Sequence, residues 1–163
     1  MTRGPQAVEP GPSGSPDADL PAPQGTGAGA PRPAVRKTRV RVRYADTDRM
    51  GVVYYANYLV WFEVGRTEWL RQAGWTYAEM ERGGISLPVI EAHCEYRQPA
   101  HYDDEIEIAT RATLLTPVRV RFDYELVRMA EGDVATIGHT VHAAVDTGGR
   151  PCRLPSRVRE MLA

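Results

Sequence analysis

Apolar and polar side chains alternate in three stretches of the sequence, residues 38–44, 105–114 and 118–126. The apolar members are Val40, Val42 and Tyr44, then Ile106, Ile108, Ala112 and Leu114, and then Val118, Val120, Phe122, Tyr124 and Leu126. A period of two is typical of β-strands that bury one face and expose the other. Because antiparallel sheets commonly keep one solvated face, the pattern predicts an antiparallel sheet with one apolar side.

A single long helix supplies the other large apolar surface. Residues 55–73 carry apolar side chains at helical spacing, and Gly74 suits the left-handed residue that ends a helix. The predicted helix is about 19 residues long, or roughly 28 Å. Residues 59–62 are all apolar, which makes one complete turn apolar all round. We therefore expect the first half of this helix to be enclosed, with the sheet wrapped around it.

Shorter signals complete the expected fold. Thr76 and Glu79 have the spacing of a capping box, which predicts a short helix that ends near Arg82. Residues 85–99 and 134–145 are the remaining strand candidates, so five antiparallel strands are expected in an α+β fold. One sheet cannot enclose a helix on all sides, and long apolar edge strands tend to pair, so we expect at least a dimer.

Residues 1–36 differ in composition from the rest of the chain. They hold 8 of the 13 prolines and 6 of the 15 glycines, with no aromatic residue. Such a segment cannot bury an apolar core, so we predict a disordered Pro/Gly/Ala-rich tail that acts as a linker rather than as a docking motif. The folded domain is then residues 37–163, which is long enough to bury about two thirds of its surface.

Charge and composition exclude several classes of function. The net charge of -1 and the pI near 6.4 leave no basic field for nucleic acid. No apolar run is long enough to cross a bilayer, and the first residues lack the apolar core of a signal peptide. With only two cysteines, we expect a reduced, cytoplasmic protein without membrane insertion. His139 and His142 would point to opposite faces of a strand, so no metal site is expected.

The break between the first strand and the long helix is the candidate site. Asp46 and Asp48 precede Gly51, and the predicted helix starts a few residues later. The first turn of a helix has about four unpaired N–H groups and a positive end, which can hold a developing oxyanion. A carboxylate on the preceding loop can face the same carbonyl carbon, and glycine permits a tight turn. From the residues alone, a plain turn whose aspartates bond their own backbone is the simpler interpretation.

Residues 42–70, VRYADTDRMGVVYYANYLVWFEVGRTEWL, resemble the hotdog-fold acyl-CoA thioesterases of the 4-hydroxybenzoyl-CoA thioesterase family, including the Tol-Pal-associated thioesterases. EYRQPAHYDDEI (residues 95–106) and RLPSRV (residues 153–158) are similar to later parts of the same family, and the resemblance covers residues 37–163. It implies a hotdog fold, in which a five-stranded antiparallel sheet wraps around one long central helix. It also implies active sites at the subunit interfaces of a homodimer or homotetramer.

The resemblance separates the two aspartates. It implies that Asp48 is the catalytic carboxylate, that the Tyr55 N–H holds the thioester oxygen, and that Asp46 is a turn residue. Two departures from the family pattern stand close to these positions. Tyr55 replaces a histidine found in many Tol-Pal-associated members, and Arg49 and Met50 replace the proline and small residue of hydroxybenzoyl-type enzymes.

Substrate contacts are expected at Gly51, Val53, Tyr54 and Glu63. Glu63 matches the position that contacts an aromatic hydroxyl in hydroxybenzoyl-type members. An ion pair with Arg66 on the same helix face is the plainer interpretation. Because a helix glutamate is catalytic in a related hotdog lineage, Glu63 is also the alternative if Asp48 is inert.

These residues predict an enzyme that hydrolyses acyl thioesters of coenzyme A or acyl carrier protein to a free acid and a thiol. Asp48 would act as nucleophile or as general base, and no cofactor is expected because a thiolate leaves readily. The alternative is a non-catalytic acyl-CoA-binding or regulatory domain of the same fold. A hotdog hydratase is excluded, because it needs an Asp and His pair near the helix start and no histidine occurs between residues 38 and 92.

Overall fold

The structure is a computed structural model that describes residues 34–162. Its elements are β1 (Val35–Arg41), the short 3-10 helix η1 (Tyr44–Asp46), α1 (Asn57–Gln72), α2 (Tyr77–Arg82), β2 (Val89–Tyr96), β3 (Glu105–Thr116), β4 (Arg119–Arg128), β5 (Val134–Ala143) and α3 (Ser156–Leu162). The predicted tail of residues 1–36 lies outside the described residues except for its last three positions. Because β1 begins at Val35, the folded part starts before the predicted boundary at residue 37.

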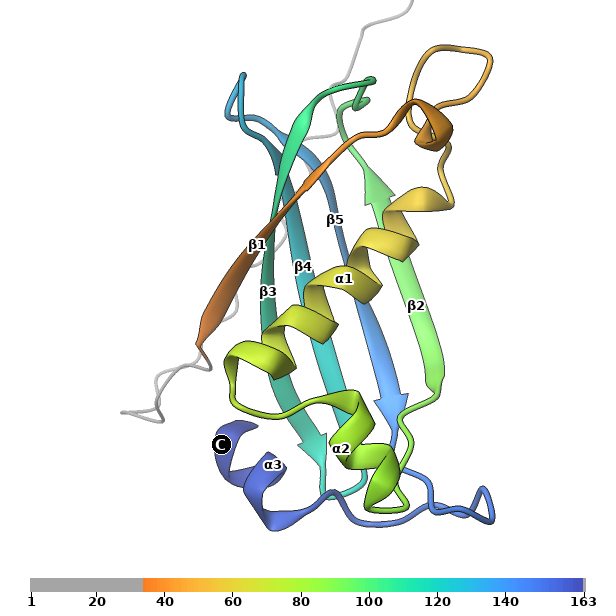
Figure 1. The fold of residues 1–163 in the computed structure, drawn as a ribbon, viewed down its shortest axis with the longest axis vertical. Coiled ribbons are helices and arrows are strands. Elements are labelled where there is room, and N and C mark those ends of the chain that lie inside the picture. The colour runs from red at the N-terminus through yellow and green to blue at the C-terminus, as the bar shows by residue number, and fades with distance from the viewer. Residues whose placement is uncertain (1–33, 163) are drawn as a thin grey trace, which may run out of the picture.

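The five strands form one antiparallel sheet in the order β1-β3-β4-β5-β2. Figure 1 shows α1 running across one face of this sheet, with β1 and β2 at the two edges and with α2 and α3 at one end of the molecule. The predicted α+β architecture is therefore confirmed. Among the helices described for residues 34–162, none has the length and apolar character needed to cross a membrane.

The alternation along β3 and β4 sorts side chains between the two faces of the sheet as predicted. The buried members are Ile106, Ile108, Ala112, Val120, Phe122, Tyr124 and Leu126. From α1, Phe62 stacks on Tyr124 with ring centroids 4.3 Å apart, and Trp69 meets Phe122 edge-on at 6.1 Å. These aromatic contacts join the helix to the centre of the sheet.

Gly65 allows α1 to approach the sheet closely. A Cβ atom at this position would lie 2.6 Å from Thr110 Oγ1 and 2.8 Å from Ile108 Cγ2 on β3. Gly138 on β5 has the corresponding role, because a Cβ atom there would lie 2.6 Å from the Phe62 ring. A glycine inside a helix costs about 1 kcal/mol relative to alanine, so its presence in α1 reflects packing rather than helix propensity.

The element ends confirm one prediction and correct two others. The capping box is present, since the Glu79 N–H donates to Thr76 Oγ1 at 3.2 Å. However, α1 begins at Asn57 rather than at residue 55, because the preceding residues form a turn in which the Asn57 N–H donates to the Tyr54 carbonyl. Tyr44 does not continue the inward face of the first strand: it lies in η1 and is 80% exposed.

The enclosure of α1 is incomplete in the single chain. Its side chains toward the sheet are buried, but Leu59 and Val60 on the same half of the helix are 42% and 52% exposed. On the edge strand β2, Val89 and Ile90 are exposed to a similar extent. The sheet of one chain therefore covers only one side of the helix, as expected, and full enclosure stays a prediction for the dimer.

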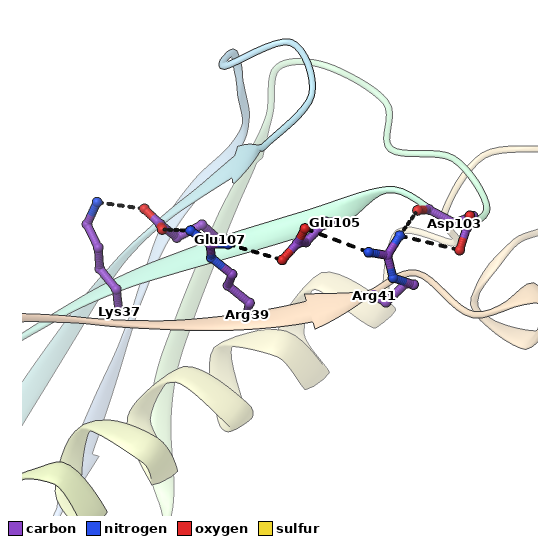
Figure 2. A network of polar contacts seen from close by, with 6 residues as sticks. All are labelled: Lys37, Arg39, Arg41, Asp103, Glu105 and Glu107. Carbon is purple, nitrogen blue, oxygen red and sulfur yellow. Dashed lines mark hydrogen bonds and ion pairs between the residues drawn. The ribbon is translucent and has the colours of Figure 1, made fainter.

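Figure 2 shows a ladder of ion pairs along the outer face of β1 and β3. Its members are Lys37, Arg39, Arg41, Asp103, Glu105 and Glu107. Lys37 Nζ lies 2.6 Å from Glu107 Oε1, and Arg39 Nη1 lies 3.3 Å from Glu105 Oε1. The basic side chains are more than half exposed, so each pair contributes less than about 1 kcal/mol. The acidic partners neutralise the basic face of the first strand.

Candidate active site

A tight turn after β1 holds the loop that carries the candidate residues. The buried Asp46 carboxylate accepts hydrogen bonds from the Arg43 backbone N–H at 2.9 Å and from the Arg43 guanidinium at 2.7 Å. The side-chain hydrogen bond to Arg43 outweighs burial and holds the pKa of Asp46 below its usual range. The Asp46 carbonyl accepts in turn from the Tyr54 N–H at 2.9 Å and from Asn57 Nδ2 at 2.8 Å. Asp46 therefore fixes the loop to the start of α1.

Asp48 begins a second turn. Its N–H donates to the Val52 carbonyl and its carbonyl accepts from the Gly51 N–H, both at 2.9 Å, and Gly51 has the left-handed φ of 77° that this turn requires. Asp48 Oδ1 accepts from the Met50 N–H at 2.8 Å. Within residues 34–162 no donor reaches Asp48 Oδ2. The carboxylate is therefore held by one oxygen and has the other oxygen free.

Asp48 lines a pocket of about 330 Å³ beside the start of α1. The other lining residues are Val52, Val53, Tyr55, Tyr58, Tyr96, Arg97, Gln98 and Pro99. They come from the loop after β1, the start of α1 and the connection between β2 and β3. The Val53 N–H donates to the Ala100 carbonyl at 2.8 Å, and the Ala100 N–H donates to the Tyr58 hydroxyl at 3.3 Å. These bonds hold the three segments together.

The Tyr55 N–H lies near the positive end of α1. The helix starts two residues later at Asn57, with no side-chain cap on Ala56 and no acidic residue in its first turn. The positive end of the helix dipole is therefore not neutralised by a cap or by an acidic residue of the first turn of α1. In the part of the chain that the structure describes, no acceptor takes the Tyr55 N–H. A ligand oxygen can accept this N–H without displacing a bond within the protein.

Three other predicted site residues adjoin the pocket in different ways. Val53 lines it directly. Gly51 shapes the turn beside it, with open space where a Cβ atom would lie. Tyr54 is not a lining residue: its side chain is 42% exposed and packs against Tyr55, with ring centroids 4.5 Å apart.

Glu63 lies away from this pocket in the single chain. It lines a separate hollow of about 620 Å³ together with Arg66 and Tyr77. The expected ion pair between Glu63 and Arg66 is not among the contacts of the described residues. Instead, Arg66 Nη1 donates to the Tyr77 hydroxyl at 2.8 Å, and the guanidinium lies over the Tyr77 ring at 5.3 Å.

Sequence reasoning assigns no site role to residues 96–99, which form one wall of the pocket. They reach the pocket because Val52 pairs with His101 in an isolated antiparallel bridge. The stretch EYRQPAHYDDEI contains them and resembles the family, so it is the signal that could have identified this wall. The pairing itself leaves no periodic pattern in the sequence.

The histidines are engaged elsewhere. The buried ring of His142 hydrogen-bonds to the Leu87 carbonyl and to the Thr140 hydroxyl, both at 2.9 Å. Burial lowers the pKa of His142 to about 4. His139 Nε2 lies 2.8 Å from a Glu91 carboxylate oxygen. Among residues 34–162 no group of three or more His, Cys, Asp or Glu side chains is placed to hold a metal ion.

A five-stranded antiparallel sheet packed on a central helix is the hotdog fold, which this chain shares with solved thioesterases. The chain belongs to the thioesterase-like superfamily, whose family model matches residues 42–162. The predicted family and the predicted enzyme class, a thioester hydrolase, are confirmed.

Individual relatives agree with this membership. The chain is 32% identical over 123 residues to the 1,4-dihydroxy-2-naphthoyl-CoA hydrolase of Synechococcus elongatus, a match that covers 74% of this chain and 89% of that protein. It is 34% identical over 103 residues to the acyl-CoA thioester hydrolase YbgC of Escherichia coli, covering 63% and 76%. The solved DHNA-CoA thioesterase of Staphylococcus aureus superimposes with a TM-score of 0.71 at 33% identity, covering 74% and 80%.

Proposed function

We propose that this chain hydrolyses acyl-CoA thioesters, with Asp48 as the catalytic carboxylate and the Tyr55 N–H as the oxyanion donor. Membership of the thioesterase-like superfamily and the acyl-CoA hydrolases among the relatives support the reaction. One observation carries the assignment of roles. Asp48 and Tyr55 line one pocket. Among the described residues, Asp48 Oδ2 has no hydrogen-bond donor and the Tyr55 N–H has no acceptor.

The proposed reaction needs few protein groups, because a thiolate leaves readily. In one route, Asp48 Oδ2 attacks the thioester carbon, the C–S bond breaks to release the coenzyme A thiolate, and water hydrolyses the mixed anhydride. In the other route, Asp48 takes a proton from a water molecule whose oxygen attacks the same carbon, and the C–S bond then breaks to release the coenzyme A thiolate and the free acid. Both routes place negative charge on the carbonyl oxygen, where one oxyanion donor such as the Tyr55 N–H is worth about 2.7–4 kcal/mol.

A single turnover in water labelled with the heavy oxygen isotope addresses the choice between these routes. When water attacks the Asp48 side of a mixed anhydride, the label enters the Asp48 carboxylate. The general-base route sends all of the label to the product acid. Mass spectrometry of the peptide that contains Asp48 therefore establishes the nucleophilic route if the label is found there.

The walls of the pocket favour an aromatic acyl group carried by coenzyme A. Tyr55, Tyr58 and Tyr96 line the pocket, and the last two meet edge-on with ring centroids 5.2 Å apart. Aromatic rings gain from such edge and offset contacts beyond the area they bury. Two of the relatives are named for a dihydroxynaphthoyl-CoA substrate, which supports the same substrate class.

The proposed active unit is a homodimer or a homotetramer built from it. Leu59 and Val60 on the central helix and Val89 and Ile90 on the edge strand β2 are exposed in the single chain. A second copy that covers these side chains removes apolar surface from water and satisfies the unpaired edge of the sheet. It also brings a second α1 to the interface.

A thiol-release assay tests the proposed reaction. Wild-type protein is supplied with aromatic, short-chain and long-chain acyl-CoAs and with one acyl carrier protein thioester. The expected result is thiol release from acyl-CoA, fastest with the aromatic acyl groups. Binding of acyl-CoA without thiol release from any member of the panel would support the non-catalytic acyl-CoA-binding domain instead.

A further inference from the structure

Tyr96 is the last residue of β2, and its side chain reaches the start of α1. Its hydroxyl donates a hydrogen bond to the Tyr55 carbonyl at 3.0 Å. Both tyrosines line the candidate pocket with Asp48. A strand from the far edge of the sheet therefore contacts the residue that supplies the proposed oxyanion donor.

The backbone around Tyr55 depends on contacts from outside the helix. Tyr55 and Ala56 precede the first residue of α1, and Ala56 has no side-chain cap. On the N-terminal side, the Tyr54 N–H donates to the Asp46 carbonyl at 2.9 Å. On the C-terminal side, the bond from Tyr96 holds the Tyr55 carbonyl. The peptide that carries the Tyr55 N–H is also held at its own carbonyl, because the Tyr54 C=O accepts from the Asn57 N–H at 2.9 Å. The bond from Tyr96 holds the next peptide and so restricts the backbone of Tyr55 from the other side.

The ring of Tyr96 is held independently of its hydroxyl. It meets the buried Tyr58 ring edge-on at 5.2 Å, and Tyr58 meets Trp61 in the same way at 5.2 Å. Burial, followed by a hydrogen bond with Cys94, raises the pKa of Tyr96 to about 12. The hydroxyl is therefore protonated and able to donate throughout the neutral pH range. Removal of the hydroxyl alone leaves the ring contacts in place.

We propose that Tyr96 is a positioning residue for thioester hydrolysis, which orients the Tyr55 N–H toward the reacting oxygen through the bond to the Tyr55 carbonyl. The inference rests on the proposed function, because it assigns Tyr96 an effect on the oxyanion donor. An oxyanion donor acts only when it is held in the geometry of the transition state, and a displacement of about 1 Å can cost 100-fold in rate. The bond from Tyr96 opposes such a displacement from the C-terminal side of Tyr55, beside the bond from the Asn57 N–H to the Tyr54 carbonyl.

The test compares Tyr96→Phe with wild type in the thiol-release assay. The expected result is a fall in kcat of about 10- to 100-fold, with KM within about twofold of wild type, because the lost contribution belongs to the transition state. Tyr102→Phe is the matched control. Tyr102 is exposed, lies outside the pocket and packs edge-on against Tyr44, so wild-type kcat is expected.

A second measurement follows the thioester carbonyl of the bound substrate. Asp48→Asn protein is expected to turn over slowly enough for the bound substrate to be observed. In this variant, the infrared stretch of the bound thioester carbonyl should shift to lower frequency when the Tyr55 N–H donates to it. Adding Tyr96→Phe should remove most of that shift. An unchanged kcat, a change in KM alone, or an unchanged carbonyl frequency in the double variant would overturn the role of Tyr96. Absence of thiol release by the wild type would overturn the proposed function and this inference together.

Discussion

Replacement of Asp48 by asparagine isolates the proposed catalytic carboxylate. Asparagine has nearly the same shape, and its Oδ1 can still accept the Met50 N–H that lies 2.8 Å from Asp48 Oδ1. The turn bonds to Val52 and Gly51 use only the backbone of Asp48. The substitution therefore changes only Oδ2, from a free carboxylate oxygen to an amide NH₂ that can neither attack a carbonyl nor accept a proton. The fold is expected to be unaffected.

The loss of rate follows from what remains in the pocket. Removing one catalytic group while the rest of a site stays in place costs about 10³- to 10⁵-fold in kcat, or about 4–7 kcal/mol in the barrier. The Tyr55 N–H is retained, so some rate above that in water is expected. KM should change little, because Asp48 acts at the reacting carbon. Thiol release at saturating acyl-CoA measures both constants.

Asp103→Asn is the matched control for this substitution. Asp103 is exposed, lies outside the pocket and has a φ of 70°, a conformation that asparagine adopts as readily as aspartate. It should retain wild-type kcat and a Tm within about 4 °C of wild type, because its exposed ion pair with Arg41 contributes less than about 1 kcal/mol. Wild-type turnover in Asp48→Asn would refute the assignment of the carboxylate. A fall in Tm of more than about 4 °C would show instead that the fold had been damaged by about 1 kcal/mol or more.

Three further predictions concern packing, pH and assembly. Gly65→Ala should lower Tm by about 3–10 °C in a calorimetric melt, because its Cβ atom would meet Thr110 Oγ1 at 2.6 Å; an unchanged Tm would contradict the close approach of α1. Burial lowers the pKa of His142 from 6.5 to about 4, so the folded state excludes a proton that the unfolded chain accepts. Stability in urea should therefore be full above about pH 6.5 and fall by about 3 kcal/mol toward pH 4, and His142→Gln should lose this part of the slope. Val60→Asp should leave the fold intact but shift the protein to monomer in light scattering, whereas Leu115→Lys, exposed on β3, should not.

β3 and β4 were predictable because burial acts on them with a period of two, and most of their alternating apolar residues are buried. The edge strand β2 has no such pattern, because none of its side chains is fully buried in the single chain. The start of α1 was less predictable. Tyr55 belongs to the helical pattern by its spacing, yet it lies in the turn before Asn57. Helical periodicity cannot register this difference, because a turn at a helix start directs side chains much as the helix does. The difference does not decide the state of the Tyr55 N–H, because the first N–H groups of a helix have no acceptor within it in either case.

The site was harder to predict from the sequence than the fold, because its residues differ in their contacts rather than in their residue type. Asp46 and Asp48 are the same residue type two positions apart, and both hydrogen-bond within turns. The carboxylate of Asp46 is buried and accepts hydrogen bonds from Arg43, whereas Asp48 keeps one carboxylate oxygen free. Only the resemblance to the family distinguished them in advance. Tyr96, 41 residues from Tyr55, had no local pattern that could mark it.

The apolar turn of residues 59–62 shows what a sequence pattern specifies and what it leaves open. Four consecutive apolar residues require cover on every side of the helix. The sheet covers the side of Trp61 and Phe62 and cannot also reach Leu59 and Val60. One chain does not meet this requirement, so full cover of the helix stays a prediction for the proposed dimer. In the proposed dimer, a second copy supplies the cover that Leu59 and Val60 lack in one chain.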